Sequence, residues 1–197
     1  MSPASLRETV LRAAVEHIAA HGPDGLSFRQ VAAAAGVSHQ APYHHFTDRT
    51  GIFQAIALEG FAMFAAALRQ AAERTDVDTS TALLGSYVEF AVGHPGHFRV
   101  MFRADLTHIG ENPELAAVGD ESFDVLVDHV QRLLGDGASV AEIRSRVIAM
   151  WSLAHGLATL LIDGPLEHKL GTVADRQALI RTVAAETGLS APRDARG

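Results

Sequence analysis

The amino-acid sequence predicts an all-α protein. Apolar residues recur at steps of three and four along most of its 197 residues, which is the spacing of one buried face of an α-helix. Segments rich in glycine and proline, such as HGPDG at 21–25, interrupt this periodicity, and residues that can cap a helix follow several of them. No segment of any length alternates apolar and polar residues as a half-buried β-strand does.

Three helices are expected within the first 50 residues. The apolar positions between Ser5 and His21 predict the first helix, and Ser27 is a suitable N-cap for a second helix that ends at a glycine. Ser38 is expected to cap a third helix, which closes at Phe46. Two short helices joined by a glycine-containing turn form a helix-turn-helix, whose second helix can enter the major groove of DNA.

The remaining residues predict a larger helical domain. The expected elements are a long helix capped by Thr47 or Asp48 and running to about Arg74, a helix at 81–92, a short aromatic turn at 97–103, a loop at 109–113, and helices at 114–134, 140–162 and 173–187. We therefore divide the chain into a helix-turn-helix domain at 1–48, a helical ligand-binding and dimerisation domain at 49–190, and a disordered tail at 191–197.

Composition indicates a globular protein of the cytoplasm. Hydrophobic residues make up 48% of the chain, which is ample for a core, and cysteine is absent, which excludes disulfides and thiolate metal sites. Charged residues interrupt the N-terminal segment, so it lacks the apolar run of a signal peptide. We expect no membrane span, because no stretch reaches about 18 uninterrupted apolar residues.

The net charge of −7 argues against DNA binding for the chain as a whole, since affinity for phosphates comes from lysine and arginine. The charge is unevenly distributed, however. Residues 1–50 contain four basic and four acidic residues, a net charge of zero, together with five of the 11 histidines. The N-terminal segment is therefore neutral, which permits binding to DNA without indicating it.

A resemblance to a known family gives these patterns a function. The segment from Leu26 to Ile56, LSFRQVAAAAGVSHQAPYHHFTDRTGIFQAI, resembles the DNA-binding domain of TetR-family bacterial transcriptional regulators. Shared features are the helix of small residues, the Ala-Gly-Val-Ser turn, the aromatic-x-x-Phe ending and a basic residue three places later. HPGHFRVMFR at 94–103 and the Trp-x-x-x-His-Gly pattern at 151–156 are similar to one subgroup of the family's ligand domains.

The chain departs from the family pattern at two places. It has Ala-Pro-Tyr at 41–43 where members commonly have Thr-Leu-Tyr, and Arg49 where lysine is usual. Proline removes an amide donor, but in the first turn of a helix that donor has no intrahelical partner. We therefore expect a helix from Ser38 to tolerate Pro42, and the resemblance implies no operator sequence.

A DNA reader needs some side chains that reach base edges and others that hold phosphates. Gln40 can pair with adenine and Ala41 can contact a thymine methyl, while His39 could serve either purpose. The resemblance implies phosphate contacts from Tyr43, His44 and Arg49, with Ser27 and Arg29 reaching the DNA backbone from the supporting helix. The full predicted set is Ser27, Arg29, Ser38, His39, Gln40, Ala41, Tyr43, His44 and Arg49. The alternative is that Tyr43 and Phe46 only pack, and that His44 and His45 are solvated surface.

The apolar residues of the C-terminal part are expected to form a cavity with few polar groups, which would suit binding better than catalysis. The residues expected to line it are Tyr87, Phe90, Phe98, Met101, Phe102, Phe123, Trp151 and His155. A small apolar or amphipathic effector would fit them, and the assignment rests mainly on the resemblance. The alternative is a plain core, in which His155 is a satisfied buried histidine.

Enzymatic and metal chemistry are not indicated. His94 and His97, with Asp105 and His108 downstream, could be drawn as a metal site, but capping or hydrogen bonding within the ligand domain explains them better. No G-x-S-x-G signature or glycine-rich phosphate loop is present. We expect no catalytic residue, no metal and no cofactor.

These observations predict a ligand-responsive transcriptional repressor. It would bind double-stranded palindromic operator DNA as a homodimer through the last two long helices, 140–162 and 173–187, because two-fold symmetry places two readers on successive major grooves. The alternatives are a helical interaction or small-molecule-binding protein that does not bind DNA, and, with less support, a helical enzyme.

Overall fold

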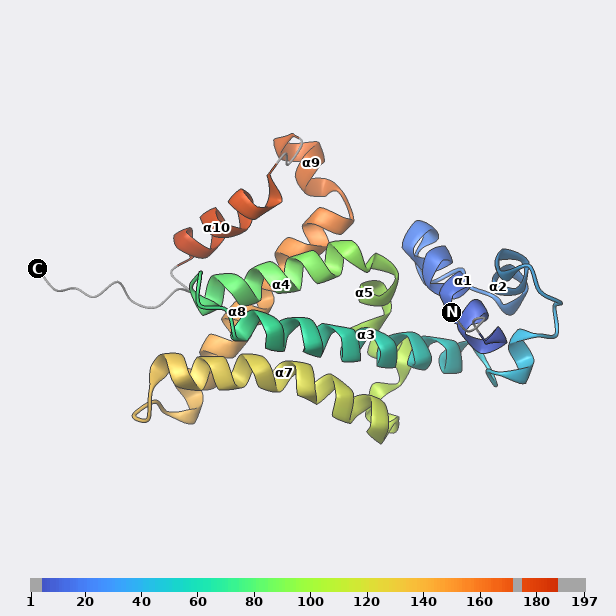
Figure 1. The fold of residues 1–197 in the computed structure, drawn as a ribbon, viewed down its shortest axis with the longest axis horizontal. Coiled ribbons are helices and arrows are strands. Elements are labelled where there is room, and N and C mark those ends of the chain that lie inside the picture. The colour runs from blue at the N-terminus through green and yellow to red at the C-terminus, as the bar shows by residue number, and fades with distance from the viewer. Residues whose placement is uncertain (1–4, 172–174, 188–197) are drawn as a thin grey trace, which may run out of the picture. The chain divides into compact units, whose positions relative to one another are not determined.

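The computed structural model describes residues 5–171 and 175–187 and confirms the all-α prediction, because all regular secondary structure in these two ranges is helical (Figure 1). Its helices are α1 (Leu6–His21), α2 (Phe28–Ala35), η1 (Pro42–His44), α3 (Arg49–Ala72), α4 (Thr79–Gly93), α5 (Pro95–Met101), α6 (Ala104–Thr107), η2 (Ile109–Glu111), α7 (Pro113–Leu134), α8 (Val140–Ile162), α9 (Pro165–Leu170) and α10 (Arg176–Glu186), η marking a 3₁₀ helix. The tail at 191–197 lies outside the described residues.

Caps and periodicity place most of these helices where the sequence predicts them. The Ser5 side chain accepts a hydrogen bond from the Glu8 amide, and Ser27 does the same for Gln30. The Asp48 carboxylate accepts from the Gly51 amide at 2.9 Å and so caps α3. Other segments differ: the aromatic turn is the helix α5, which begins at a proline, and the loop expected at 109–113 contains the 3₁₀ helix η2. The short helices α6 and α9 were not predicted.

The prediction of an α-helix from Ser38 to Phe46 is wrong, because the helix in this segment is a short 3₁₀ helix. The backbone forms turns and the 3₁₀ helix η1, in which amides bond carbonyls three residues back, as Ala41 does to Ser38 at 2.9 Å. Counted from an N-cap at Ser38, the amide of Pro42 would be the first to close an α-helical hydrogen bond. Proline has no amide hydrogen, so the segment takes the tighter helix instead.

The described residues form two compact units. One joins residues up to 63 with residues 94–119, and the other joins residues 64–93 with residues from 120 onward. The long helices α3 and α7 each begin in the first unit and end in the second. The division at residue 48 stays a prediction.

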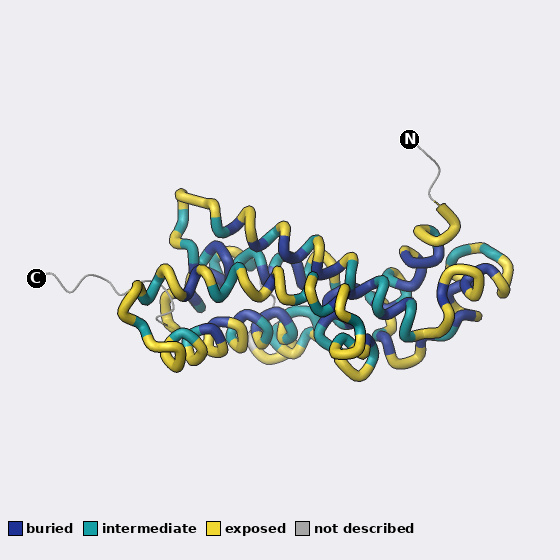
Figure 2. Tube along the Cα trace, turned by 90° about the horizontal axis from the view of Figure 1, so that it is seen from below, coloured by how far each residue is buried: buried dark blue, intermediate teal, exposed yellow. Residues whose placement is uncertain are grey.

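In the first unit, α1 packs on both α2 and α5. Both helices and the loop between them contain buried apolar residues (Figure 2); these include Val10, Ala14, Ile18, Leu26 and Val31. Burial of apolar surface holds α2 in place, since this helix has only eight residues and would not be stable alone. The unit therefore offers a firm base for the segment that follows α2.

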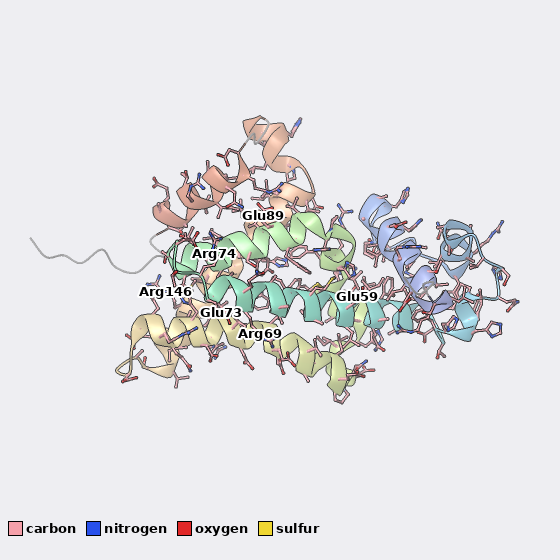
Figure 3. The ribbon with its side chains drawn as sticks, viewed as in Figure 1. Glu59, Arg69, Glu73, Arg74, Glu89 and Arg146 are labelled. Carbon is pink, nitrogen blue, oxygen red and sulfur yellow. The ribbon has the colours of Figure 1, made fainter. Side chains whose placement is uncertain are left out.

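In the second unit, α4 packs on α8 and α10 (Figure 1). Glu89 lies on α4 (Figure 3) and accepts two hydrogen bonds from the Arg176 guanidinium on α10, at 3.0 and 2.8 Å. Buried Ser80 at the start of α4 lies 2.9 Å from Nε2 of His129 on α7. These polar contacts fix the register of helices whose packing is otherwise apolar.

By length and composition, α3 and α8 are each apolar enough to cross a membrane. Their most apolar windows have mean hydropathy 1.7 and 1.4, and 50% and 28% of the two windows is buried, respectively. The core helix of a soluble protein meets the same criteria, so two such helices are weak evidence for a membrane. The low burial of α8 does show that much of its apolar surface is uncovered within one chain.

Candidate nucleic-acid interface and ligand region

In the segment 38–46, which follows α2, some side chains are buried and anchor the segment, and the others are exposed to solvent. Ala41 and Phe46 are each 5% exposed, and Pro42 is also buried. The residues around them face outward: Ser38, His39, Gln40, Tyr43, His44 and His45 are exposed. Residues 38–46 therefore form a strip that is anchored by buried apolar side chains and presents polar and aromatic groups to the outside.

This arrangement sorts the predicted DNA-binding residues. Arg29 and Arg49 are exposed together with the outward residues of the strip, and Ser27 is half-buried. Ala41 departs from the prediction, because its side chain belongs to the core of the first unit and its methyl group is not offered to a base. We therefore leave Ala41 out of the interface.

Tyr43 combines packing with exposure. Its ring meets the Phe28 ring edge-on, with centroids 4.5 Å apart, and lies 5.9 Å from the His39 ring. Tyr43 nevertheless remains 51% exposed. Packing against α2 thus orients Tyr43 without enclosing it, so the packing and phosphate-contact interpretations are compatible.

Two of the predicted phosphate contacts already make bonds within the protein. The Ser27 hydroxyl accepts from the Gln30 amide at 3.3 Å and donates to the Gln30 side chain at 2.6 Å. Arg49 Nη2 donates to the Asp24 carbonyl at 3.2 Å, while its guanidinium lies 5.6 Å from the centre of the Phe53 ring. Both contacts restrain an exposed polar group, which lowers the entropy lost when it binds.

The predicted ligand residues are divided between the two units. Phe98, Met101 and Phe102 lie in the first, and the others lie in the second. The Phe102 ring packs edge-on against Phe98 and Phe61, at 5.4 and 5.6 Å, and Met101 abuts Gly60, where an added Cβ would lie 2.6 Å from the sulfur. These close contacts favour the core alternative for the three residues of the first unit.

A polar cluster on α4 and α8 connects three of the other predicted ligand residues, Tyr87, Trp151 and His155. The Tyr87 hydroxyl lies 2.8 Å from Nδ1 of His155, and the Trp151 side chain also hydrogen bonds Tyr87. Burial raises the pKa of Tyr87 and lowers the pKa of His155, so both are neutral at pH 7. The hydroxyl can then accept from the Trp151 N–H and donate to His155. The Trp-x-x-x-His spacing thus places two side chains, one helical turn apart, on one hydroxyl.

Two aromatic residues of the predicted cavity lie at the surface instead of inside it. Phe123 on α7 and Trp151 on α8 are 40% and 39% exposed, and their rings meet edge-on at 5.7 Å. An open depression of about 520 Å³ lies farther along α7 and α8, and its lining residues, none of them predicted, are Leu134, Ala141, Glu142, Ser145, Arg146 and Ala149. The ligand-residue assignment stays a prediction.

The residues raised as an alternative metal site make different contacts. His97 is 7% exposed, with Nε2 3.7 Å from the Glu59 carboxylate, whereas His108 is exposed beside Glu111. Asp105 forms a bidentate ion pair with Arg103, in which both hydrogen bonds are 2.8 Å long. Within residues 5–171 and 175–187, no three histidine or acidic side chains are grouped as metal ligands.

Buried histidines predict that the protein loses stability in mild acid. Burial lowers the pKa of His97, His129 and His155 below the ordinary 6.5, so the unfolded chain binds more protons than the folded chain below that pH. The neutral histidines therefore make their full contribution to the free energy of unfolding above pH 6.5. This contribution declines as the pH falls from 6.5 toward the lowered pKa values of the folded protein. We expect the melting temperature to drop between pH 7.5 and 5.5.

The variant His129→Gln tests the origin of this decline. Glutamine retains a hydrogen-bonding group for Ser80 but does not titrate, so the variant should lose less stability between the two pH values than the parent protein. Thermal unfolding followed by circular dichroism measures both proteins. Identical pH dependence would show that His129 contributes nothing to it.

Comparison with known proteins identifies the family. Residues 10–56 match the family profile described as bacterial regulatory proteins, tetR family, and residues 80–186 match the tetracyclin repressor-like C-terminal domain. The chain belongs to the TetR family. The two matches cover the helix-turn-helix with the start of α3, and the helices from α4 to α10.

Individual proteins also resemble the chain. The HTH-type transcriptional repressor AcnR of Corynebacterium glutamicum is 36% identical over 63 residues, which are 32% of this chain and 34% of the repressor. A protein of unknown function from Rhodococcus sp. RHA1 is 31% identical, with a TM-score of 0.72 over 97% of this chain and all of that one. The match to the curated repressor thus spans about a third of its length.

More distant structures share the fold. The fatty acid degradation regulator FadR from Bacillus halodurans has a TM-score of 0.69 at 18% identity, covering 94% of this chain and 95% of FadR. AibR, solved with isovaleryl coenzyme A and operator DNA, has the same score at 16% identity, covering 95% of this chain and 99% of AibR. At this identity the likeness concerns the fold alone.

Proposed function

We propose that this TetR-family protein is a DNA-binding transcriptional repressor of the cytoplasm that binds a palindromic operator as a homodimer. The observation that carries the proposal is the strip at 38–46, whose outward side chains are polar or aromatic while Ala41, Pro42 and Phe46 fix it to a core. The likeness to the repressor AcnR over 63 residues supports the repressing role. The proposal includes no catalytic step and no cofactor.

The exposed residues divide into base-reading and phosphate-holding groups. Gln40 has the amide that pairs bidentately with adenine, and His39 lies beside it. Tyr43, His44 and Arg49 would hold phosphates from the same strip and from the start of α3, and Ser27, Arg29 and Ser38 would do so from the supporting turns. A neutral local charge means that each cation contributes a large share of the affinity.

Tyr43→Ala and Arg49→Ala are expected to weaken binding to all DNA sequences alike. Loss of a charged phosphate contact by Arg49→Ala should also reduce the slope of log affinity against log salt by about 1. Gln40→Ala should instead relax sequence preference and leave that slope unchanged. Fluorescence anisotropy titrations on operator and random DNA, at several salt concentrations, measure both quantities. An unchanged slope for Arg49→Ala would return this residue to a packing role.

The homodimer is proposed to form mainly through α8. Exposed residues recur every fourth position along this helix, which is the geometry of a packing ridge; they are Val140, Arg144, Ile148, Ser152, Gly156 and Leu160. All but one are uncharged, and Gly156 has nothing within 4 Å of a built Cβ, so a second helix could approach closely. A second copy of the chain would cover this surface by two-fold symmetry, with α10 beside it.

The effector is proposed to be a small apolar or amphipathic molecule bound among Tyr87, Phe90, Trp151 and His155, the region of the Trp-x-x-x-His-Gly subgroup pattern. It could change operator affinity only by binding one state of the dimer more tightly than the DNA-bound state. Tilting of α3, which begins beside the reader, would alter the spacing of the two readers. A mobility-shift titration with saturating effector measures this coupling. Unchanged operator affinity would contradict the proposal that the effector controls DNA binding.

A helical interaction protein without DNA binding is the second candidate. The exposed pair of Phe123 and Trp151 favours it, because large aromatic rings at a surface often mark a protein contact. It predicts no role for the exposed amide of Gln40. Titrations with the Gln40→Ala variant therefore separate the two candidates.

A further inference from the structure

One face of α5 runs along α1 and the loop that follows it, all within the first unit. Three residues of the α5 segment make successive contacts: Gly96 with Val15, Arg99 with the C-terminal end of α1, and Arg103 with Asp24. Their spacing of three and four residues is that of one helical face. The contacts join residues about 80 apart in the chain, so no local pattern in the sequence reveals them.

Gly96 allows the two backbones to touch. A Cβ built at this position would lie 2.3 Å from the Val15 carbonyl oxygen and 2.9 Å from a Val15 methyl carbon. Real side chains do not approach a backbone atom so closely, so any larger residue must push α5 away from α1. The glycine therefore sets the distance between the helices.

Arg99 completes the end of α1. Its Nη1 donates to the Ala19 carbonyl at 2.8 Å and lies 3.4 Å from that of Ile18, which already accepts from the Gly22 amide. Ala19 is among the last four residues of the helix, whose carbonyls have no intrahelical partner. The guanidinium thus satisfies a helix-end acceptor and places a positive charge at the negative end of the helix dipole.

Arg103 extends the same line to the loop before α2. Its Nη2 lies 3.3 Å from the Asp24 carboxylate, and the carbonyl of that same aspartate accepts from Arg49 at the start of α3. The line of contacts therefore begins at α1 and ends at a residue expected to hold phosphate. The proposed DNA-binding segment lies between α1 and the start of α3. Contacts from Arg99 and Arg103 connect both of these ends to the α5 segment.

We infer that Arg99 is a positioning residue for DNA binding: by holding the C-terminal end of α1 against α5, it sets the orientation in which α2 and the strip at 38–46 meet DNA. This inference rests on the proposed function. Since α1 packs on α2, a shift of α1 moves the reader away from its base-contacting orientation. Contacts with phosphates tolerate such a shift better than contacts with base edges.

The test compares Arg99→Ala, the conservative Arg99→Lys and the close-contact variant Gly96→Ala. The matched control is Arg69→Ala, which removes an exposed ion pair with Glu121 in the second unit. Operator affinity and affinity for random DNA are measured by anisotropy, and backbone order is measured by hydrogen–deuterium exchange. The exchange measurement does not require DNA.

Arg99→Ala and Gly96→Ala should weaken operator binding on the order of tenfold while changing random-DNA binding little, and Arg99→Lys should recover most of the loss. Exchange should rise in residues 15–31 and stay unchanged in α8. Operator affinity and exchange at the parent level in both variants would overturn the inference, as would faster exchange throughout the chain with equal losses on both DNAs. If the parent protein binds no DNA, the proposed function is contradicted. The hydrogen–deuterium exchange of residues 15–31 alone then decides whether Arg99 stabilises the DNA-reading segment.

Discussion

Glutamate at both Ile148 and Gly156 on α8 is expected to convert the protein into a monomer and to weaken operator binding by about 100-fold or more. Ile148 is 50% exposed and Gly156 faces open space, so neither substitution disturbs the fold of a single chain. In a dimer, the two charges would be buried against their symmetry copies without partners. The reader would remain intact, but only one half of a palindrome could be bound at a time.

Sedimentation equilibrium and anisotropy on the same samples measure the two effects. Ala117→Glu, at an exposed position of α7, adds one glutamate outside the proposed interface and should leave both dimer and affinity unchanged. A variant that stays dimeric would show that α8 is not the interface. A monomer that keeps full operator affinity would separate dimerisation from DNA binding.

Phe46→Ala is expected to cost about 3 kcal/mol or more of unfolding free energy, because it leaves a cavity in a small core. The Phe46 residue is 5% exposed, and the Arg7 guanidinium lies 5.3 Å from the centre of its ring. Loss of this anchor should release the strip at 38–46, so operator binding falls with stability. Urea unfolding measures the first effect and anisotropy the second.

Tyr43→Ala provides the comparison for this prediction. Tyr43 lies in the same strip but is 51% exposed, so its removal should cost much less stability while still weakening DNA binding. Phe46→Leu, which fills most of the cavity, should retain most of the stability if Phe46→Ala proves too unstable to purify. Equal stability losses for Tyr43→Ala and Phe46→Ala would contradict the division into anchoring and presented residues.

Local signals in the sequence predict most of the helices because their causes are local. Ser5, Ser27 and Asp48 each satisfy an amide within the next three residues, and the periodic apolar positions need only a neighbouring helix to cover them. Pro42 shows the limit of this reasoning. Its missing amide falls at the first position that must close a hydrogen bond, one residue beyond the tolerant part of the turn.

The candidate sites depend on distant contacts and were predicted less completely. The sequence identifies the polar strip after α2, but burial of Ala41 follows from tertiary packing that periodicity does not show. Likewise, the Trp151 and His155 spacing is visible in the chain, whereas their shared partner Tyr87 lies 68 residues from His155. The role inferred for Arg99 depends on a contact of the same kind.

The central claim is that the strip at 38–46 reads DNA. The most direct measurement is an anisotropy titration of a labelled DNA fragment that flanks the protein's own gene, with the parent protein and with Gln40→Ala, in competition with random DNA. We predict saturable binding by the parent protein that random DNA displaces poorly, and a reduced preference in the variant. Binding that random DNA displaces equally well, or no binding at low salt, would contradict the claim.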